Sequence, residues 1–209
     1  MTVKKKRTKR FVRNTIIIFL LSFLSIGLYL GYQINRRVSH IMDWSSEIEK
    51  ISTNYQMEDY QPLIKAIILA ESKGNKIDLM QSSESRYGTV GEIASEKESL
   101  EAGIAFLSES IKLGKDENVD IWTSVQAYNF GLNYIYYVSE RGGKNTIQLA
   151  ETYSKEVLAP TLGNKELTTY SYKLPQAIIY NGGQLYQNGG NFFYAEVVKW
   201  YLKIINWFT

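Results

Sequence analysis

One glutamate, Glu71, follows an apolar stretch at residues 62–70, and this position is typical of a catalytic acid. In a helix it would share one face with Ile64, Ile67 and Ile68, because steps of three and four residues return to the same side. A carboxyl group against an apolar face has a raised pKa, since burial disfavours its charged form. It can then hold a proton near neutral pH and donate it to a leaving group. The alternative is that a glutamate in the last helical turn simply reaches solvent.

A short polar segment, residues 78–85, follows Glu71 after one turn of chain. The apolar pair Leu79-Met80 at its centre would pin the segment to the core and keep its polar side chains within reach of the glutamate. Taken alone, the pattern is only that of a polar loop. Its carboxylates and hydrogen-bonding groups are those of Asp78, Gln81, Ser82, Ser83 and Glu84.

The composition removes most rival chemistries. The chain has no cysteine and a single histidine, His40. Cysteine nucleophiles, disulfides and Cys/His zinc sites are therefore excluded, and we expect neither a metal nor a cofactor. A Ser-His-Asp triad needs a histidine inside the folded domain, and we expect His40 to lie before it. Carboxylates, hydroxyls and amides must carry any catalysis.

The charge is divided unevenly along the chain. Nine of the 24 Lys and Arg residues, and no acid, fall in residues 1–37. Residues 38–209 therefore hold 15 basic and 21 acidic side chains, a balance of −6. An acidic domain argues against nucleic acid as its ligand.

The basic residues near the amino terminus precede an uncharged apolar run at 14–35. Its central 18 residues, 15–32, would span about 27 Å as a helix, just under the roughly 30 Å of a bilayer core. A cleaved signal peptide is the alternative, but it needs a small-residue cleavage site, and residues 28–32 are bulky. Seven basic residues precede the run and only Arg36 and Arg37 follow closely, which predicts a single-pass anchor with a cytoplasmic amino terminus.

Helical periodicity dominates the rest of the chain. No run of alternating, strand-like segments is evident, so we expect a mainly α-helical domain. Ile41, Trp44, Ile48 and Ile51 form a stripe that either prolongs the anchor helix or packs on the domain. The predicted division is a basic cytoplasmic tail (1–13), a transmembrane anchor (14–35), a helical stalk or linker (36–54) and an outer domain (55–209). Its expected helices start near Pro62 and cover 96–114, 120–129, 133–140, 145–157 and 194–207.

Tyrosine is unusually abundant, with 16 Tyr against 8 Phe. Tyr180 and Tyr186 flank a glycine-bearing polar segment, and an apolar ring with a polar tip suits the faces and hydroxyls of sugars. The alternative is that tyrosine fills half-exposed positions anywhere.

Three short motifs occur in order, and together they resemble those of soluble lytic transglycosylases and goose-type lysozymes. They are Glu71-Ser72-x-Gly74-Asn75, Leu79-Met80-Gln81 and Ala127-Tyr128-Asn129-x-Gly131. Residues 99–107 are similar to the helix between the second and third motifs, and residues 190–201 to the closing helix. The segment 78–85 looks most like the CwlT-type lysozyme domains of Gram-positive cell-wall hydrolases. The resemblance covers about residues 55–205.

Two departures from the transglycosylase pattern favour the CwlT-type group. Only nine positions separate Glu71 from Met80, where lytic transglycosylases usually carry a longer loop. Asp78 stands where they usually have glycine.

The resemblance implies peptidoglycan as substrate and cleavage of the β-1,4 bond after N-acetylmuramic acid, with Glu71 as general acid. Asp78, or else Glu84, would stabilise the sugar cation or activate water. Two alternatives stay open: a lytic transglycosylase that forms anhydro products with help from the substrate's N-acetyl group, and a catalytically silent glycan-binding module. Asn129 would bond either substrate or backbone. The expected substrate-binding residues are Gln81, Ser83, Glu84, Tyr128, Asn129, Tyr180 and Tyr186.

Overall fold

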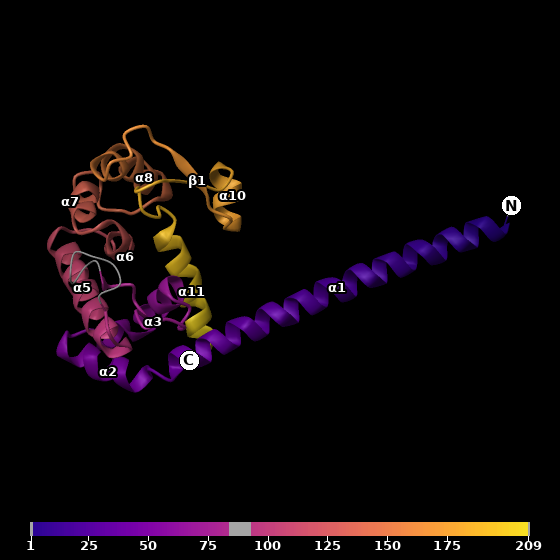
Figure 1. Ribbon diagram of the computed structural model, residues 1–209, viewed down its shortest axis with the longest axis horizontal. Helices are drawn as coiled ribbons and strands as arrows, with labels where there is room; N and C mark the ends of the chain where they lie inside the picture. Colours follow the sequence, from indigo (N-terminus) through magenta and orange to yellow (C-terminus); the bar gives the residue numbers. More distant parts are fainter. Residues whose placement is uncertain (1, 84–92, 209) are drawn as a thin grey trace.

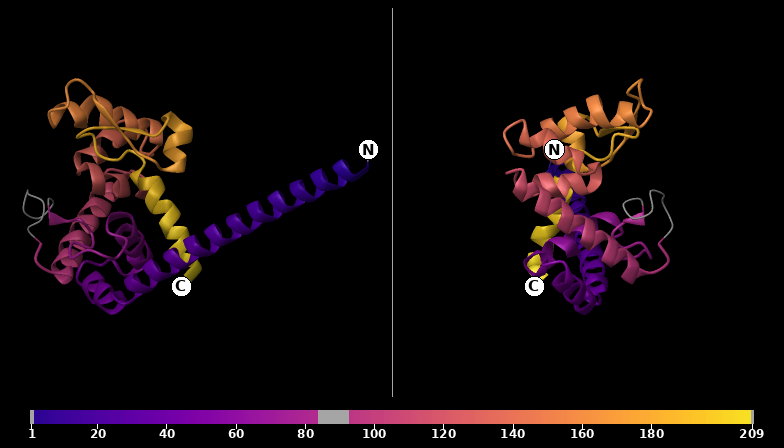
Figure 2. Two further views of the ribbon diagram at one scale, coloured as in Figure 1. Left: turned by 45° about the vertical axis from the view of Figure 1, so that its right-hand side comes forward. Right: turned by 90° about the vertical axis from the view of Figure 1, so that its left-hand side faces the viewer.

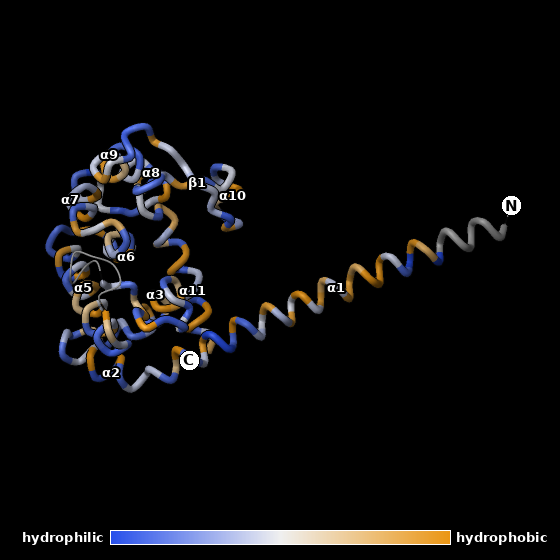
Figure 3. The backbone as a smooth tube through the Cα atoms, in the orientation of Figure 1, coloured by the Kyte–Doolittle hydropathy of each residue, from blue (hydrophilic) through white to orange (hydrophobic). Residues whose placement is uncertain are grey.

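The computed structural model describes residues 2–83 and 93–208, with side chains from residue 10 onward. A single long helix, α1 (Thr2–Met42), leaves a helical domain and extends far from it (Figure 1). Within the described residues, one helix is long and apolar enough to cross a membrane, over Arg10–Met42. Its apolar section lies outside the domain, between two hydrophilic stretches (Figure 3).

The domain begins earlier than residue 55. Val38 and Ile41, in the last turns of α1, are buried in the core, and so are Ile48 and Ile51 of α2 (Ser45–Asn54). The stripe at 38–55 therefore both prolongs the anchor helix and packs on the domain, and the segment expected as a stalk or linker is part of the folded unit. His40 lies on the surface of that unit rather than before it.

The first of two hydrophobic cores lies around α3 (Gln61–Glu71), which follows the turn η1 (Glu58–Tyr60). It is completed by α2, α5 (Glu96–Asp116), α6 (Ile121–Phe130) and α11 (Tyr194–Phe208). Local signals set the ends of these helices: the Ser95 hydroxyl accepts from the Glu98 backbone N–H at the start of α5, and Gly131 ends α6 at a φ of 86°.

The second core is rich in aromatic rings, among them Phe130, Tyr134, Tyr153, Phe192 and Phe193. Edge-on contacts join several of them, with the Tyr134 and Tyr153 ring centroids 5.0 Å apart. The elements around this core are α7 (Asn133–Ser139), α8 (Ile147–Tyr153), the π-helical turn η2 (Ser154–Leu158), α9 (Ala159–Thr161) and α10 (Pro175–Asn181).

Two features were not expected from the sequence: helix α10, and an antiparallel pair of strands, β1 (Thr169–Ser171) and β2 (Gln184–Tyr186). Tyr170 pairs with Leu185 at its centre, and α10 lies in the connection. Each strand has three residues, too few to produce a visible alternation of apolar and polar side chains. The prediction of a mainly α-helical fold is confirmed.

Helix α11 links the two cores. It starts beside the aromatic core and ends next to the point where α1 leaves the domain, so that the carboxyl terminus lies near α1 while the amino terminus is distant (Figures 1 and 2). Its buried residues include Tyr194, Val198 and Ile205, which pack in the first core against α3.

Candidate active site

Glu71 is the last residue of α3, whose apolar face is fully packed in the core. The chain turns sharply after it. The Ser72 hydroxyl donates to the Ile68 carbonyl at 3.2 Å and accepts from the Gly74 backbone N–H at 3.1 Å. Gly74 has a φ of 75°, and a Cβ there would lie 3.0 Å from Ile41, so only glycine fits without displacing α1. The helix end that carries Glu71 is thus fixed by its neighbours.

The Glu71 carboxyl group sits in the environment that the sequence predicted. Its side chain is half-buried, and burial raises the pKa of the carboxyl group to about 7. The Tyr194 hydroxyl, which favours the carboxylate, and the positive charge of Lys76 oppose this rise, while the negative charge of Asp78 adds to it. A carboxyl group in this state is about half protonated at neutral pH and can act as a general acid.

Asp78 has the opposite environment. Burial alone would raise its pKa, but hydrogen bonds from Ser99, Ser83 and Ser82 outweigh burial and lower it. One carboxylate oxygen accepts from the Ser99 hydroxyl at 2.6 Å and the Ser82 backbone N–H at 2.9 Å. The other accepts from the Ser83 hydroxyl at 2.7 Å and its N–H at 3.2 Å. Asp78 is therefore an ionised group that folds its own loop and ties it to α5.

The remaining loop residues differ in their accessibility. Gln81 is exposed, has a φ of 48°, and donates from its side-chain amide to the Asp78 carbonyl at 2.9 Å. A left-handed conformation in a non-glycine residue is costly and is often retained at functional sites. Ser83 was expected to bind substrate, but it is 2% exposed and its hydroxyl donates to Asp78, so it supports the loop instead. Glu84 lies outside the described residues.

Tyr128 forms part of the wall behind the loop. It is buried, and its hydroxyl donates to the Met80 carbonyl at 2.9 Å. Burial, with smaller contributions from the charges of Glu71 and Asp78, holds its pKa well above the usual value, so the phenol stays neutral. Gly103 of α5 makes room for this arrangement, because a Cβ there would lie 2.6 Å from Met80. Tyr128 thus positions the loop and offers little surface to a ligand.

Tyr194 is the site residue that the sequence analysis did not select, although it lies in the segment that resembles the closing helix. Its ring stacks on that of Tyr128, with centroids 6.3 Å apart and planes at 9°. Burial, with the charge of Glu71 as the next cause, raises its pKa well above the usual value. The hydroxyl is buried and makes no hydrogen bond of standard geometry within the described part of the chain, so its contact with Glu71 is polar but short of a formed bond.

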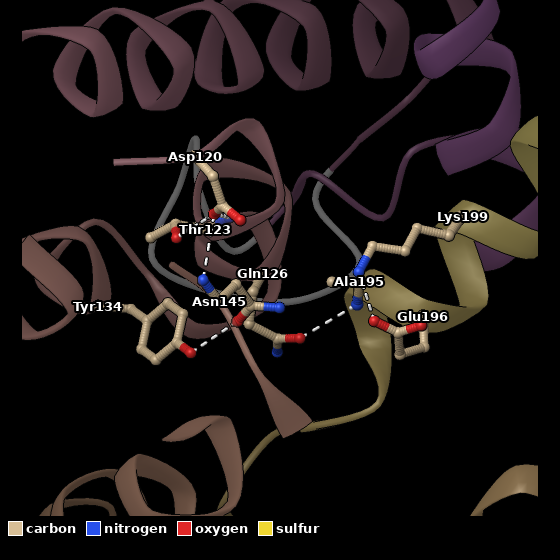
Figure 4. A network of polar contacts seen from close by, with 8 residues as sticks. All are labelled: Asp120, Thr123, Gln126, Tyr134, Asn145, Ala195, Glu196 and Lys199. Carbon is tan, nitrogen blue, oxygen red and sulfur yellow. Dashed lines mark hydrogen bonds and ion pairs between the residues drawn. The ribbon is translucent and has the colours of Figure 1, made fainter. Parts of the chain in front are cut away.

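Buried polar contacts of Gln126 join α6 to the start of α11, and Figure 4 shows the one with Ala195. Tyr128 and Tyr194 lie close by along the two helices, so these contacts help to set one ring against the other. Gln126 is fully buried; its amide accepts from the Ala195 backbone N–H at 3.1 Å and donates to the Asn191 carbonyl at 2.9 Å. At the start of α6, the Asp120 carboxylate accepts from the Thr123 hydroxyl at 2.6 Å. Breaking such a network leaves buried polar groups unpaired, which is costly.

The other expected substrate-binding residues lie in different surroundings. The Asn129 side chain accepts from the Asn191 backbone N–H at 2.7 Å, which is the backbone role that the sequence left open. Tyr180 and Tyr186 pack at the edge of the aromatic core, and the Tyr180 hydroxyl donates to Glu151 at 2.7 Å. Neither tyrosine has a contact with Glu71 or Asp78 among those described.

No group of three or more His, Asp or Glu residues in the described ranges could hold a metal ion. Two neighbouring carboxyl groups with oppositely displaced pKa values, at the end of a core helix, are the pattern of an acid-catalysed glycoside-cleaving site.

Comparison with known proteins gives the family. The model of the lysozyme-like family matches residues 38–202, and the chain belongs to this family. It is 42% identical over 187 residues to a pneumococcal vaccine antigen A homolog of Streptococcus pyogenes, and the match covers 90% of this chain and 92% of that relative. It is 36% identical over 107 residues to the bifunctional muramidase/DL-endopeptidase CwlT of Bacillus subtilis, covering 51% of this chain and 32% of that one.

A solved structure agrees with the family. A lipoprotein-like protein of the NLP/P60 family from Staphylococcus aureus aligns with a TM-score of 0.71 at 37% identity, over 78% of this chain and 52% of that one. The expected resemblance to CwlT-type lysozyme domains is confirmed. Together the matches support a peptidoglycan-acting glycosidase or transglycosylase.

Proposed function

We propose that this chain is a membrane-anchored muramidase that cleaves the β-1,4 bond between N-acetylmuramic acid and N-acetylglucosamine in peptidoglycan. The observation that carries the proposal is the half-buried carboxyl group of Glu71, whose pKa is raised to about 7 by burial at the end of a core helix. Protonation of a poor leaving oxygen is the step that glycoside cleavage most requires, and Glu71 supplies the proton.

Asp78 supplies a fixed negative charge beside the acid. An oxocarbenium-like transition state carries positive charge on the sugar ring, and a carboxylate held ionised by hydrogen bonds stabilises that charge without first having to reorganise. The same hydrogen bonds occupy both of its oxygens, which makes Asp78 a poor nucleophile.

The proposal also gives roles to three other residues near Glu71 and to three residues farther away. Exposed Gln81 contacts the glycan, whereas Tyr128 and Tyr194 orient the loop and the acid from behind. Asn129, Tyr180 and Tyr186 stay proposed contacts for more distant sugar units, of which Asn129 is exposed and the two tyrosines half-buried.

The engagement of both Asp78 oxygens also favours a second candidate, a lytic transglycosylase. If no protein carboxylate attacks the sugar, the N-acetyl group of the substrate can assist departure, and the muramyl product closes to its anhydro form. Mass spectrometry of the released muropeptides separates the two candidates, since a hydrolase leaves reducing ends.

The membrane part of the proposal rests on α1. Its apolar run is long enough to span a bilayer, and the excess of basic residues before the run supports a cytoplasmic amino terminus and an outer position for the domain.

The test is the replacement Glu71→Gln in the full chain, assayed on purified cell walls. It keeps the shape of the side chain and removes the proton donor, so cleavage should fall by about two to four orders of magnitude. Glu140→Gln, the same change at a side chain that is 75% exposed, is the matched control. Unchanged cleavage by Glu71→Gln ends the assignment. Wall binding without cleavage by the unaltered chain instead favours a silent glycan-binding module.

A further inference from the structure

One face of the domain exposes large apolar side chains that the proposed cleavage site does not use. Trp207 of α11 is 87% exposed and Ile179 of α10 is 86% exposed, and Ile178, Trp200 and Phe208 are each about half exposed. We call these five residues the apolar face. Single exposed apolar residues need no explanation, but a group of large ones marks a contact surface.

The geometry of α11 and α10 makes this group continuous. Trp200, Lys203 and Trp207 follow one another by steps of three and four, so they share one side of α11. A hollow of about 310 Å³ joins that side to the start of α10. Its lining residues are Leu174, Pro175, Gln176, Val197, Trp200 and Tyr201.

The charge of this face is opposite to that of the domain. Residues 167–208, which carry α10 and α11, contain three lysines (Lys173, Lys199 and Lys203) and one acid, Glu196, a balance of +2, although residues 38–209 have a balance of −6. Lys199 pairs with Glu196, whereas Lys173 and Lys203 are exposed. Tryptophan and lysine together are the side chains favoured at the surface of an anionic bilayer.

The position of the face follows from α1, which continues without a break from its apolar run into the core. Buried Val38 lies only six positions after Tyr32, which ends the central 18 residues of that run, a rise of about 9 Å. The headgroup layer on each side of a bilayer is itself about 5–8 Å thick. The domain therefore cannot stand clear of the membrane that α1 spans.

The apolar face also lies on the side of the domain that would face the membrane. Figures 1 and 2 place α10 and the carboxyl-terminal end of α11 on the side of the domain toward which α1 extends. Tyr201 of α11 lies close enough to Arg37 of α1 for the Arg37 charge to oppose the rise that burial causes in the Tyr201 pKa. The outgoing helix and the apolar face are thus neighbours.

We propose that the apolar face rests in the lipid headgroup region of the membrane that α1 spans, and that this second contact holds the domain in one orientation. The inference rests on the proposed membrane anchoring by α1. It adds a lipid-binding surface on the folded domain, with anionic phospholipid as its ligand.

The chain offers a direct test, because it has no cysteine and each introduced cysteine can be labelled alone. Nitroxide labels at Ile179→Cys and Trp207→Cys would be measured in the full chain, reconstituted in vesicles of phosphatidylglycerol and phosphatidylethanolamine. Lys144→Cys, at an exposed position between α7 and α8, is the matched control. Figure 1 shows α7 on the side of the domain away from α1 and α10. Phe19→Cys reports insertion of α1.

Relaxation of each label by oxygen, which concentrates in lipid, is compared with relaxation by a water-soluble nickel chelate. The expected result is an oxygen-to-nickel ratio at 179 and 207 several-fold above that at 144, falling in neutral phosphatidylcholine vesicles. If 179 and 207 match 144 while 19 lies in lipid, the inference is overturned and the anchor stands. Protection of 179 and 207 from both reagents means a protein contact, such as a second copy, and also overturns it. A water-exposed label at 19 overturns the anchor and this inference together.

Discussion

The pH dependence of cleavage tests the assignment of Glu71 most directly. An acid with a pKa of about 7 is half protonated at pH 7, whereas a glutamate at the ordinary value of 4.5 is protonated only about 0.3% of the time. The environment of Glu71 thus enlarges the competent fraction of enzyme at neutral pH by roughly 150-fold. We expect kcat/KM to be flat below pH 6 and to fall about tenfold for each pH unit above 7.

The assay must separate titration of the enzyme from titration of the substrate. Soluble glycan chains without stem peptides have no group that titrates between pH 5 and 9, so their cleavage by the full chain in detergent micelles reports the enzyme alone. Initial rates at low substrate concentration give kcat/KM, the quantity that reflects the free enzyme. Glu71→Gln should leave a small residual rate with no alkaline decline in this range.

Two results would refute the reasoning about burial. A rate that declines already above pH 4.5 would mean that Glu71 has an ordinary pKa and faces open water. A rate that stays constant to pH 9 would mean that Glu71 is not the acid. In either case the apolar packing at the end of α3 would not be the source of the catalytic proton.

The contacts of the site lead to four further predictions. Tyr194→Phe removes a polar contact that favours the Glu71 carboxylate, so the alkaline decline of kcat/KM should move to higher pH. Asp78→Asn removes a neighbouring negative charge, so the alkaline decline should move to lower pH, and the unfolding temperature should fall because the loop loses its ionised anchor. Glu71→Gln should raise the unfolding temperature at pH 8 but not at pH 4. Because the pKa of Glu71 is raised in the folded protein, its contribution to the free energy of unfolding is complete below pH 4.5 and is lost as the pH rises to about 7. The free energy lost over this range is at most about 3 kcal/mol. Gly103→Ala and Gly114→Ala should each destabilise the protein by about 1–3 kcal/mol, because the new Cβ atoms would lie 2.6 Å from Met80 and 2.2 Å from Ser124. In the enzyme that remains folded, only Gly103→Ala should change the pH profile of cleavage, since only Met80 belongs to the loop beside Glu71.

The helices and the partly buried position of Glu71 could be predicted because their signals are local. The steps from Ile64 to Glu71 define one helical face, and Pro62 and Gly131 mark helix boundaries within a residue or two. The direction of the Glu71 pKa shift follows from that face, since burial is its largest cause.

The roles of the loop residues could not be predicted, since they depend on contacts between distant segments. The hydroxyl that anchors Asp78 most closely comes from Ser99, 21 positions away, on a helix whose placement no local pattern reveals. Tyr194 meets Glu71 only because α11 returns across the domain to pack on α3. Ser83 was expected to bind substrate for the same reason, because a polar side chain in a loop gives no sign that it will be buried against a neighbouring carboxylate.

The two carboxyl groups of the site affect each other's state of ionisation. Each shifts in the direction that its surroundings impose: Glu71 has lost water without gaining a full set of donors, whereas Asp78 has exchanged water for hydroxyl and backbone donors. Because the charge of Asp78 also raises the Glu71 pKa, the ionised state of one supports the protonated state of the other. A protonated acid and an anion therefore coexist at every pH between the lowered pKa of Asp78 and about 7, which is the combination that departure of a sugar leaving group requires. A site with two equally hydrated carboxyl groups would ionise both near pH 4 and would have no proton to donate at neutral pH.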